Sequence, residues 1–526
     1  MPTALLHGKE AKEKLLKGAK QLTSAVKITL GPKGQNVILE QGPNAFITND
    51  GYTIAKNISL EDKFENLGAR IVFEASAKTN EMAGDGTTTA CVIAESLIEE
   101  GLKNAYFGVS PMDIVKGMRK AGDIVIEKLE KISRKVKSNN DIKHIATISC
   151  EDEDIGALIA KGFEIVGNDG VITLEESNSM YTTLDVTDGI KFDKGYVSTY
   201  FCTNNDALVC EMDNPYILVT SDKIDSINQL LPILEQIAQG GHKIVLIATD
   251  YSDDVIASLV MNKLRGSLNV VAVKSFAYGE QKQDILEDFC ISIGANLISS
   301  EKNNNLENAT LQDLGKAKRI TITRDSSTII NGCGNKEQIK ERISTIKNLK
   351  QNCDNDFDVK VYNERLARLQ NRVAVIKVGG ATDIECSERK LRIEDALSAT
   401  KSAIEEGVVI GGGCALIKCY KTLENQMQNF NENEKIGAKI VLRALQAPLR
   451  QIAINCGQDD GVIVNTVLEN DDENFGYDAQ NNCFTSLQDC GIIDPKKVTR
   501  CALLNAISVA TSLLTTECAV TELPIK

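Results

Sequence analysis

Strand-like and helix-like segments alternate in the middle of this 526-residue chain, and this alternation constrains its fold more than any other feature. Short apolar runs at 216–219, 244–247 and 270–273 have the length and composition of buried strands, and helical runs at 226–238 and 252–265 lie between them. Strands that alternate with helices pack as a parallel sheet covered by helices. The sequence therefore predicts a central α/β domain.

The two ends of the chain have the pattern of amphipathic helices instead. Near the start, five apolar residues recur at three- and four-residue spacing before Gly31-Pro32 ends the run: Ala11, Leu15, Ala19, Leu22 and Val26. A second helix is expected after Ser110, with Ser110 as its cap, Pro111 in its first turn and Asp113 completing a capping box. We therefore expect the α/β domain to be an insertion in a helical domain built from both chain ends.

The composition excludes several classes of protein. The chain has 73 acidic and 59 basic residues, a net charge of −14, which argues against nucleic acid or an anionic membrane as its main partner. It contains no run of eighteen apolar residues and no signal-like start. Its 15 cysteines form no C-x-x-C pair, and unpaired thiols fit a reducing compartment. We therefore expect a cytoplasmic protein, or one inside an organelle if a presequence has been removed.

Two short runs in the first hundred residues supply what a triphosphate and its metal ion require. They are Thr29-Leu30-Gly31-Pro32 and Gly84-Asp85-Gly86-Thr87-Thr88-Thr89. Glycines let the backbone approach phosphate oxygens, threonine hydroxyls can donate to them, and the Asp85 carboxylate suits Mg²⁺. Each run taken alone could be an ordinary turn, and the chain has no G-x-x-x-x-G-K-[ST] motif.

Further runs in the second half of the chain identify a family. They are Glu388-Arg389-Lys390-Leu391-Arg392-Ile393-Glu394-Asp395-Ala396-Leu397, Glu405-Glu406-Gly407, Gly411-Gly412-Gly413, Ala447-Pro448-Leu449-Arg450-Gln451-Ile452 and Asp494-Pro495. In these motifs and their order the chain resembles the group I chaperonins, the GroEL family. The resemblance extends from the helix before Thr29 to Thr516-Glu517-Cys518.

The resemblance implies a multi-domain fold of α and α/β type. The family's plan would place residues 1–131 and 406–526 in a helical equatorial domain that binds ATP. Residues 132–188 and 374–405 would form a small intermediate domain, and residues 189–373 an α/β apical domain that binds substrate and co-chaperonin.

The resemblance also implies an ATP site with Mg²⁺ and K⁺ as its ions. Asp395 would orient or deprotonate the attacking water with Asp50 as its helper, and Asp85 would bind Mg²⁺. The remaining nucleotide contacts would come from Thr29, Leu30, Gly31, Pro32, Gly86, Thr87, Thr88, Thr89, Gly412, Asp478, Ala479 and Asp494.

Two central helices are apolar over a wide arc, which indicates either burial on two sides or an exposed apolar surface. The resemblance favours an exposed rim that binds non-native chains and a GroES-type lid. The rim residues would be Tyr196, Tyr200, Phe201, Leu231, Leu234, Ile256, Val260 and Met261. The family assembles as two stacked rings of seven identical subunits.

The sequence thus predicts an ATP-dependent chaperone that encloses unfolded polypeptides and promotes their folding. The alternative is a divergent paralogue that binds partners with weak or no ATP cycling. Three departures from the family pattern favour it: Asn49 in place of a lysine, Asn371-Arg372 in place of a Gly-Gly hinge, and the ending Leu523-Pro524-Ile525-Lys526. A dinucleotide enzyme is disfavoured because no G-x-G-x-x-G follows a central strand.

Overall fold

The protein divides into two compact units, one formed by both ends of the chain and one by its middle. The computed structural model describes residues 3–41, 44–150, 152–167, 171–177, 179–204, 208–277, 282–302, 304–351, 362, 365–366, 369 and 372–522. The first unit contains Met1–Lys161, Glu176–Thr183 and Val378–Lys526, and the second contains Gly162–Glu175 and Leu184–Lys377. Asn371 and residues 523–526 lie outside the described residues. The boundaries between equatorial, intermediate and apical domains stay predictions.

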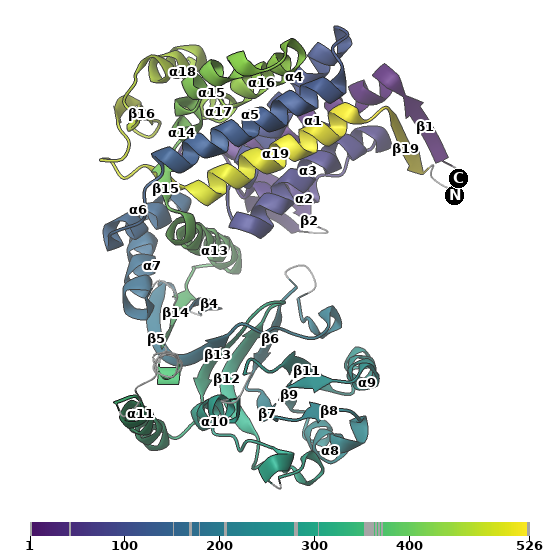
Figure 1. Cartoon of the computed structure of the whole chain (residues 1–526), viewed down its shortest axis with the longest axis vertical. Coiled ribbons are helices and arrows are strands. Elements are labelled where there is room, and N and C mark those ends of the chain that lie inside the picture. Colours follow the sequence, from purple (N-terminus) through teal and green to yellow (C-terminus); the bar gives the residue numbers. More distant parts are fainter. Residues whose placement is uncertain are drawn as a thin grey trace. The chain divides into compact units, whose positions relative to one another are not determined.

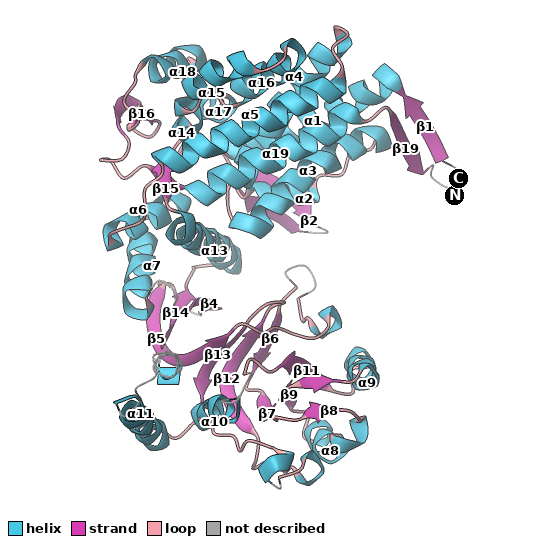
Figure 2. Ribbon diagram, in the orientation of Figure 1, coloured by secondary structure: helices cyan, strands magenta, loops and turns pink. Residues whose placement is uncertain are grey.

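The first unit is mainly helical (Figure 2). Its helices are α1 (Gly8–Val26), α2 (Gly51–Asn57), α3 (Lys63–Ala83), α4 (Thr87–Tyr106), α5 (Pro111–Ile132), α6 (Asn139–Cys150), α13 (Asp383–Glu406), α14 (Cys414–Lys418), α15 (Tyr420–Gln426), α16 (Glu432–Ala444), α17 (Ala447–Asn455), α18 (Asp460–Glu469) and α19 (Lys496–Thr515), with 3₁₀ turns η1 (Lys27–Thr29) and η6 (Met427–Asn429). Its strand pairs are β1 (Thr3–His7) with β19 (Cys518–Glu522), β2 (Val37–Gln41) with β3 (Asn44–Thr48), β15 (Val408–Ile410) with β18 (Ile493–Pro495), and β16 (Phe475–Asp478) with β17 (Cys483–Ser486).

Helices from the two chain ends share one core. The C-terminal α19 packs against α3, α4 and α5, and α16 packs against α5 (Figure 1). The predicted stripe of α1 is confirmed, because Ala11, Leu15, Ala19, Leu22 and Val26 are each at most 2% exposed. Antiparallel pairing of β1 with β19 also joins the two termini.

The start of α5 confirms one part of its predicted cap and corrects another. Pro111 is the first helical residue, as predicted, but the Ser110 side chain makes no capping hydrogen bond. The backbone N–H of Asp113 is already satisfied by the carbonyl oxygen of Ser110 at 3.1 Å, and the Asp113 carboxylate accepts from Asn433 at 3.0 Å. The predicted capping box is therefore wrong.

Among the described residues, one helix is long and apolar enough to cross a membrane, namely α19. Its most apolar window is 67% buried inside the structure. Such burial is typical of a core helix, and α19 forms part of the shared core described above. None of the described cysteines forms a disulfide, and most of them are buried.

The second unit is built on a mixed sheet. Its strands are β4 (Val171–Glu176), β5 (Thr183–Phe192), β6 (Cys210–Asp213), β7 (Tyr216–Val219), β8 (Lys223–Ile224), β9 (Lys243–Ala248), β10 (Asp250–Tyr251), β11 (Asn269–Lys274), β12 (Gly315–Ile322), β13 (Ser327–Gly332) and β14 (Arg372–Val378). Its helices are α8 (Leu231–Gln239), α9 (Asp253–Leu264), α10 (Lys282–Ile293) and α11 (Lys336–Gln351), with 3₁₀ turns η2 (Thr199–Phe201), η3 (Ile227–Gln229), η4 (Ser300–Lys302) and η5 (Leu306–Asn308). Helix α7 (Glu153–Val166) begins in the first unit and ends in the second.

The predicted parallel layer forms one part of this sheet. The described strands follow the order β11-β9-β7-β12-β13-β5-β14-β4, and β6 also pairs with β12. Strands β7, β9 and β11 are parallel, which confirms the α/β prediction. Strand β12 pairs antiparallel with β7 and β13, and β13 pairs antiparallel with β5. A short turn at 323–326 leads from β12 directly into β13, which makes that pair antiparallel. The sequence pattern did not predict this part of the sheet.

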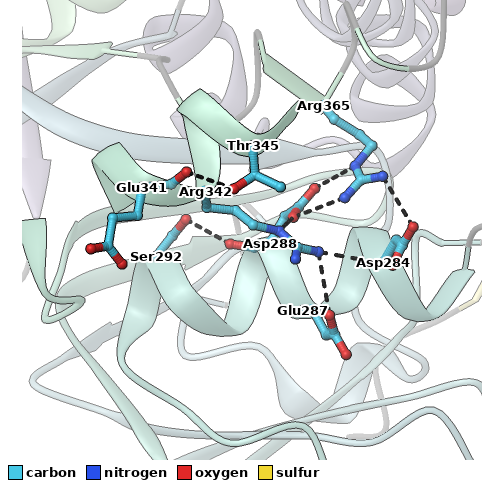
Figure 3. A network of polar contacts seen from close by, with 8 residues as sticks. All are labelled: Asp284, Glu287, Asp288, Ser292, Glu341, Arg342, Thr345 and Arg365. Atoms are coloured by element: carbon cyan, nitrogen blue, oxygen red, sulfur yellow. Dashed lines mark hydrogen bonds and ion pairs between the residues drawn. The ribbon is translucent and has the colours of Figure 1, made fainter. Parts of the chain in front are cut away.

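A buried carboxylate ties α10 to the segments that follow it in the second unit (Figure 3). The Asp288 side chain is 7% exposed and accepts from Arg342 Nε and Arg365 Nε, both at 2.6 Å. Arg365 is only 2% exposed and also reaches Asp284, while Arg342 reaches Glu287. One carboxylate therefore holds two guanidinium groups from different segments.

Replacing Asp288 by asparagine is predicted to loosen α10 and α11. The change leaves two guanidinium groups around a neutral amide, and breaking a buried ion pair costs about 3–5 kcal/mol. Hydrogen exchange of the full chain should show that loss of protection in peptides from α10 and α11. The control is Asp284→Asn, whose side chain is 54% exposed and whose loss should cost at most about 1 kcal/mol. Equal effects of the two variants would contradict the prediction.

Candidate functional site

The glycine-rich run at 84–89 forms a sharp turn between two helices of the first unit. Helix α3 ends at Ala83, and Gly84 and Gly86 follow with left-handed φ values of +70° and +80°. A Cβ at either position would be strained. Helix α4 then begins with Thr87, Thr88 and Thr89. The predicted threonines therefore lie at a helix N-terminus, where backbone N–H groups favour an anion.

Two more of the predicted segments meet this turn. Thr29 ends η1, as predicted, and its Oγ1 lies 3.5 Å from Oγ1 of Thr88. Asp50 caps α2 by accepting from the backbone N–H groups of Tyr52 at 3.2 Å and Thr53 at 2.8 Å. The next residue, Gly51, packs so closely on Thr88 that a Cβ would collide with the threonine hydroxyl. The structure thus brings together three motifs that are far apart in the sequence.

The run at 30–32 lies beside these residues. Gly31 has a φ of +87°, and a Cβ there would come 3.2 Å from the Ile452 side chain. Asn455 donates to the carbonyl oxygen of Leu30 at 2.8 Å. The loop that contains Leu30, Gly31 and Pro32 is therefore held against α17.

Four carboxylates converge on the turn. Burial raises the pKa of Asp85, and the charge of Asp50 adds to this effect. Burial, followed by the charges of Asp50 and Asp85, raises the pKa of Asp395 on α13 well above its ordinary value. Burial and the charge of Asp85 raise the pKa of Asp494 on β18 to about 7. Carboxylates in this arrangement repel one another, and a cation among them would relieve that repulsion.

The glycines that follow β15 complete the side of the site formed by β15 and β18. Gly412 and Gly413 have φ values of +64° and +74°, and the backbone N–H of Gly412 donates to the Asp494 carboxylate. A Cβ on Gly411 would come 3.0 Å from Oδ1 of Asp494. This close approach explains why the strand pair is followed by glycines.

Asp478 follows Tyr477, whose carbonyl oxygen lies near Gly412. The Asp478 carboxylate, however, accepts its hydrogen bonds from residues of its own turn. It is 5% exposed and accepts from the backbone N–H of Gln480 at 2.9 Å and from both nitrogens of Asn481. Ala479 is buried, and its carbonyl oxygen accepts from the Cys456 thiol at 3.6 Å. These two residues shape the β16–β17 turn, and their predicted contact with a nucleotide stays a prediction.

The sequence did not predict one neighbour of Asp85. The hydroxyl of Ser149, near the end of α6, donates to Oδ2 of Asp85 at 3.3 Å. The backbone N–H of Gly86 donates to the other oxygen, Oδ1, at 2.5 Å. A serine in a helix 64 residues away carries no local signal of this role, so only the tertiary structure reveals it.

The second unit corrects the predicted apolar rim. Three of its eight residues belong to the core: Tyr196 is 8% exposed, Phe201 0% and Leu234 7%. Leu234 lies on the face of α8 that packs in the sheet core with Ile233 and Ile237, and Phe201 lies beneath the Lys263 side chain. Their assignment to an exposed rim is therefore wrong, because all three side chains pack in the hydrophobic core of this unit.

Other predicted rim residues are exposed. Tyr200 is 64% exposed, Met261 48% and Leu231 42%, while Ile256 and Val260 are half-buried. Leu264, which is 63% exposed, belongs with them although it was not among the predicted residues. We call Tyr200, Leu231, Met261 and Leu264 the apolar patch.

Comparisons with known proteins agree with this fold. The model of the TCP-1/cpn60 chaperonin family matches residues 22–523 of the chain. The chain is also similar to a crystal structure of the chaperonin gp146 from the bacteriophage EL 2 (Pseudomonas aeruginosa), determined in the presence of ATP-BeFx. The two share 20% sequence identity over 99% of each chain, with a TM-score of 0.66. At this identity the likeness shows a common fold.

Replacing Asp494 by asparagine is predicted to stabilise the ligand-free protein in a pH-dependent way. The folded-state pKa of about 7 lies above the ordinary value of 3.8, so the wild-type carboxyl group destabilises the folded state increasingly as the pH rises through 3.8 toward 7. At about pH 8.5 the variant should gain at least about 1 kcal/mol, an increase in Tm of about 2–4 °C.

This advantage should shrink as the pH is lowered below 7, which thermal unfolding at a series of pH values would show. The matched control is Asp489→Asn, because Asp489 is exposed. A gain for Asp494→Asn that does not change with pH would contradict the prediction.

Proposed function

Because this chain belongs to the TCP-1/cpn60 chaperonin family, we propose that it is a chaperone that hydrolyses ATP as it binds and releases non-native polypeptides. The observation that carries the proposal is the convergence of Asp50, Asp85 and Asp395 on a threonine-lined turn. A separate α/β unit presents the apolar patch. The phage chaperonin of the same fold was crystallised with ATP-BeFx, which supports a nucleotide as the ligand.

The donor groups fit a magnesium nucleotide. Asp85 offers hard carboxylate oxygens to Mg²⁺, and Thr87, Thr88 and Thr89 offer hydroxyls and helix N-terminal N–H groups to phosphates. Thr29, Leu30, Gly31 and Pro32 would line the phosphate and adenosine side, with Gly86, Gly412, Asp478, Ala479 and Asp494 completing it. Bound Mg²⁺ would supply positive charge among the carboxylates and polarise the phosphate oxygens.

Asp395 is the proposed general base. It lies half-buried on α13, and burial together with the charges of Asp50 and Asp85 raises its pKa. Its carboxylate would accept a proton from the attacking water, with Asp50 helping to orient that water. A cation beside Asp85 would offset the repulsion and favour the deprotonated form of Asp395 that this step needs.

Asn49 limits the proposed rate. The family pattern has a lysine here, and a cation at the transferring phosphate is a main source of transition-state stabilisation. The asparagine amide can donate a hydrogen bond but carries no charge. We therefore propose slow turnover, with K⁺ as a second ion that contributes positive charge.

The apolar patch is the proposed polypeptide-binding surface. Apolar contact is non-directional and accepts many sequences, so exposed apolar residues on η2, α8 and α9 suit unfolded clients. Ile256 and Val260 would contribute at its half-buried edge. We further propose a GroES-type lid that competes for this surface, a homo-oligomer of two stacked seven-membered rings, and a cytoplasmic location, all from the family plan.

The second candidate is a divergent paralogue that keeps the fold and the apolar patch without cycling on ATP. Asn49 favours it, because the replacement removes a charge from the nucleotide site. The two candidates differ in one measurable property, namely hydrolysis of ATP by the purified chain.

Replacing Asp395 by alanine is predicted to lower ATP turnover by about 10²–10⁴-fold, because a general base contributes about that factor. Binding of Mg²⁺-ATP should persist, since the threonine-lined turn is unchanged. Steady-state hydrolysis and equilibrium nucleotide binding would be measured side by side. The control is Glu394→Ala, which removes the exposed neighbouring acid on α13. Wild-type hydrolysis no faster than that of Asp395→Ala would favour the paralogue.

Polar substitutions in the apolar patch are predicted to reduce capture of a chemically unfolded client at least several-fold while ATP hydrolysis is unchanged. The variants are Tyr200→Ser and Met261→Ser, and the control is Met180→Ser, an exposed methionine of the first unit. The readout is suppression of client aggregation. Leu234→Ser should instead destabilise the second unit, because Leu234 is buried. Unchanged capture by both patch variants would contradict the proposed surface.

A further inference from the structure

Three serines that no motif singled out surround the turn Ala83–Gly86. The hydroxyl of Ser402 on α13 donates to the carbonyl oxygen of Ala83 at 3.0 Å, and both residues are 4% exposed. The Ser398 side chain packs on Gly84 so closely that a Cβ there would collide with it. Ser149 on α6 donates to Asp85. Three consecutive residues of the turn are thus each contacted by a serine.

The two α13 serines share a helix face with Asp395. Asp395, Ser398 and Ser402 are separated by three and four residues, the spacing that places side chains on one face of a helix. Ser402 contacts Ala83, and Ser398 contacts Gly84. The third residue, Asp395, lies close enough to Asp85 for that charge to raise its pKa. From Ser402 back to Asp395, each turn of α13 therefore lies beside the next residue of the loop. These contacts fix the position of α13 along the loop.

The Ser402 hydroxyl donates to a carbonyl oxygen that needs a hydrogen-bond donor. Ala83 is the last residue of α3, and the final carbonyl groups of a helix have no partner within it. The Gly84 N–H closes the helix on Asn80, four residues back, which leaves the Ala83 carbonyl oxygen to Ser402. A buried carbonyl without a partner costs about 1–3 kcal/mol, so this contact favours the position of α13 described above.

We propose that Ser402 and Ser149 are positioning residues of the ATPase reaction. Ser402 holds α13 on the end of α3 so that Asp395 faces the metal-binding side of the turn, and Ser149 orients the Asp85 carboxylate toward Mg²⁺. Ser398 permits the close approach because it is small. The inference rests on the proposed ATPase function and adds to it the residues that align the base with the metal ligand.

The first test is Ser402→Ala with Ser387→Ala, an exposed serine of the same helix, as its control. Turnover of Ser402→Ala should fall about 10-fold or more, because displacement of a catalytic group by about 1 Å can cost up to 10²-fold. The KM for ATP and equilibrium binding of a fluorescent ATP analogue should stay within about twofold, since the threonines and glycines are untouched. Ser402→Thr, which keeps the hydroxyl, should recover most of the turnover.

The second test separates the role of Ser149 from that of Ser402. In Ser149→Ala, the Mg²⁺ concentration that half-saturates binding of the ATP analogue should rise about 10-fold, because a group that hydrogen-bonds a metal ligand typically contributes about 10–100-fold to metal affinity and this hydrogen bond is long, at 3.3 Å. Binding of the analogue without Mg²⁺ should not change. Ser402→Ala should leave the Mg²⁺ requirement as in the wild type.

Hydrogen exchange tests the inference without hydrolysis. In the ligand-free full chain, peptides covering 80–86 and 394–404 should exchange faster in Ser402→Ala than in Ser387→Ala. If the wild type proves inactive but this difference is present, the proposed function fails while the positioning contact stands. Turnover and exchange of Ser402→Ala equal to the control would overturn the inference, as would a loss of nucleotide affinity as large as the loss of turnover.

Discussion

Burial of Asp85, Asp395 and Asp494 close to other carboxylates is the constraint that the helical unit must accommodate. Each carboxylate comes from a different part of the chain, and burial together with the neighbouring charges raises the pKa of all three. Holding such groups together costs free energy, which the surrounding packing must offset. The shared core of α3, α4, α5 and α19 is the structure that does so.

Glycines and serines make the close contacts of this site possible. Gly84 and Gly86 adopt left-handed φ values that turn α3 into α4, and Gly51 lets α2 approach Thr88. Ser402 satisfies the carbonyl oxygen at which α3 ends. Because α13 is fixed there, Asp395 reaches a turn more than three hundred residues earlier in the chain. Motion of α13 would therefore change the distance between Asp395 and Asp85, which links the position of that helix to the proposed chemistry.

The α/β unit shows how one helix can place apolar residues both in the core and at the surface. On α8, Leu234 and Ile237 pack in the core while Leu231 is exposed, and on α9 Leu259 is buried while Met261 is exposed. A residue's place on the face depends on the angle at which each helix meets the sheet, and the spacing of apolar residues does not specify that angle. The sequence also did not reveal the antiparallel pairing of β12 and β13, since strand length and composition do not distinguish pairing directions.

The sequence by itself determined the helices of the chain ends, the parallel strands β7, β9 and β11, and the family, because periodicity and short motifs are local properties of the chain. Motifs also singled out Asp85 and Asp395, which the structure brings close enough for their charges to interact, while their roles stay predictions. Only the tertiary structure decided that Tyr196, Phe201 and Leu234 are buried and that Ser149 and Ser402 contact the turn at 83–86. Burial and hydrogen bonding between distant segments depend on how elements pack. The residues next to a serine or leucine in the sequence do not indicate that packing.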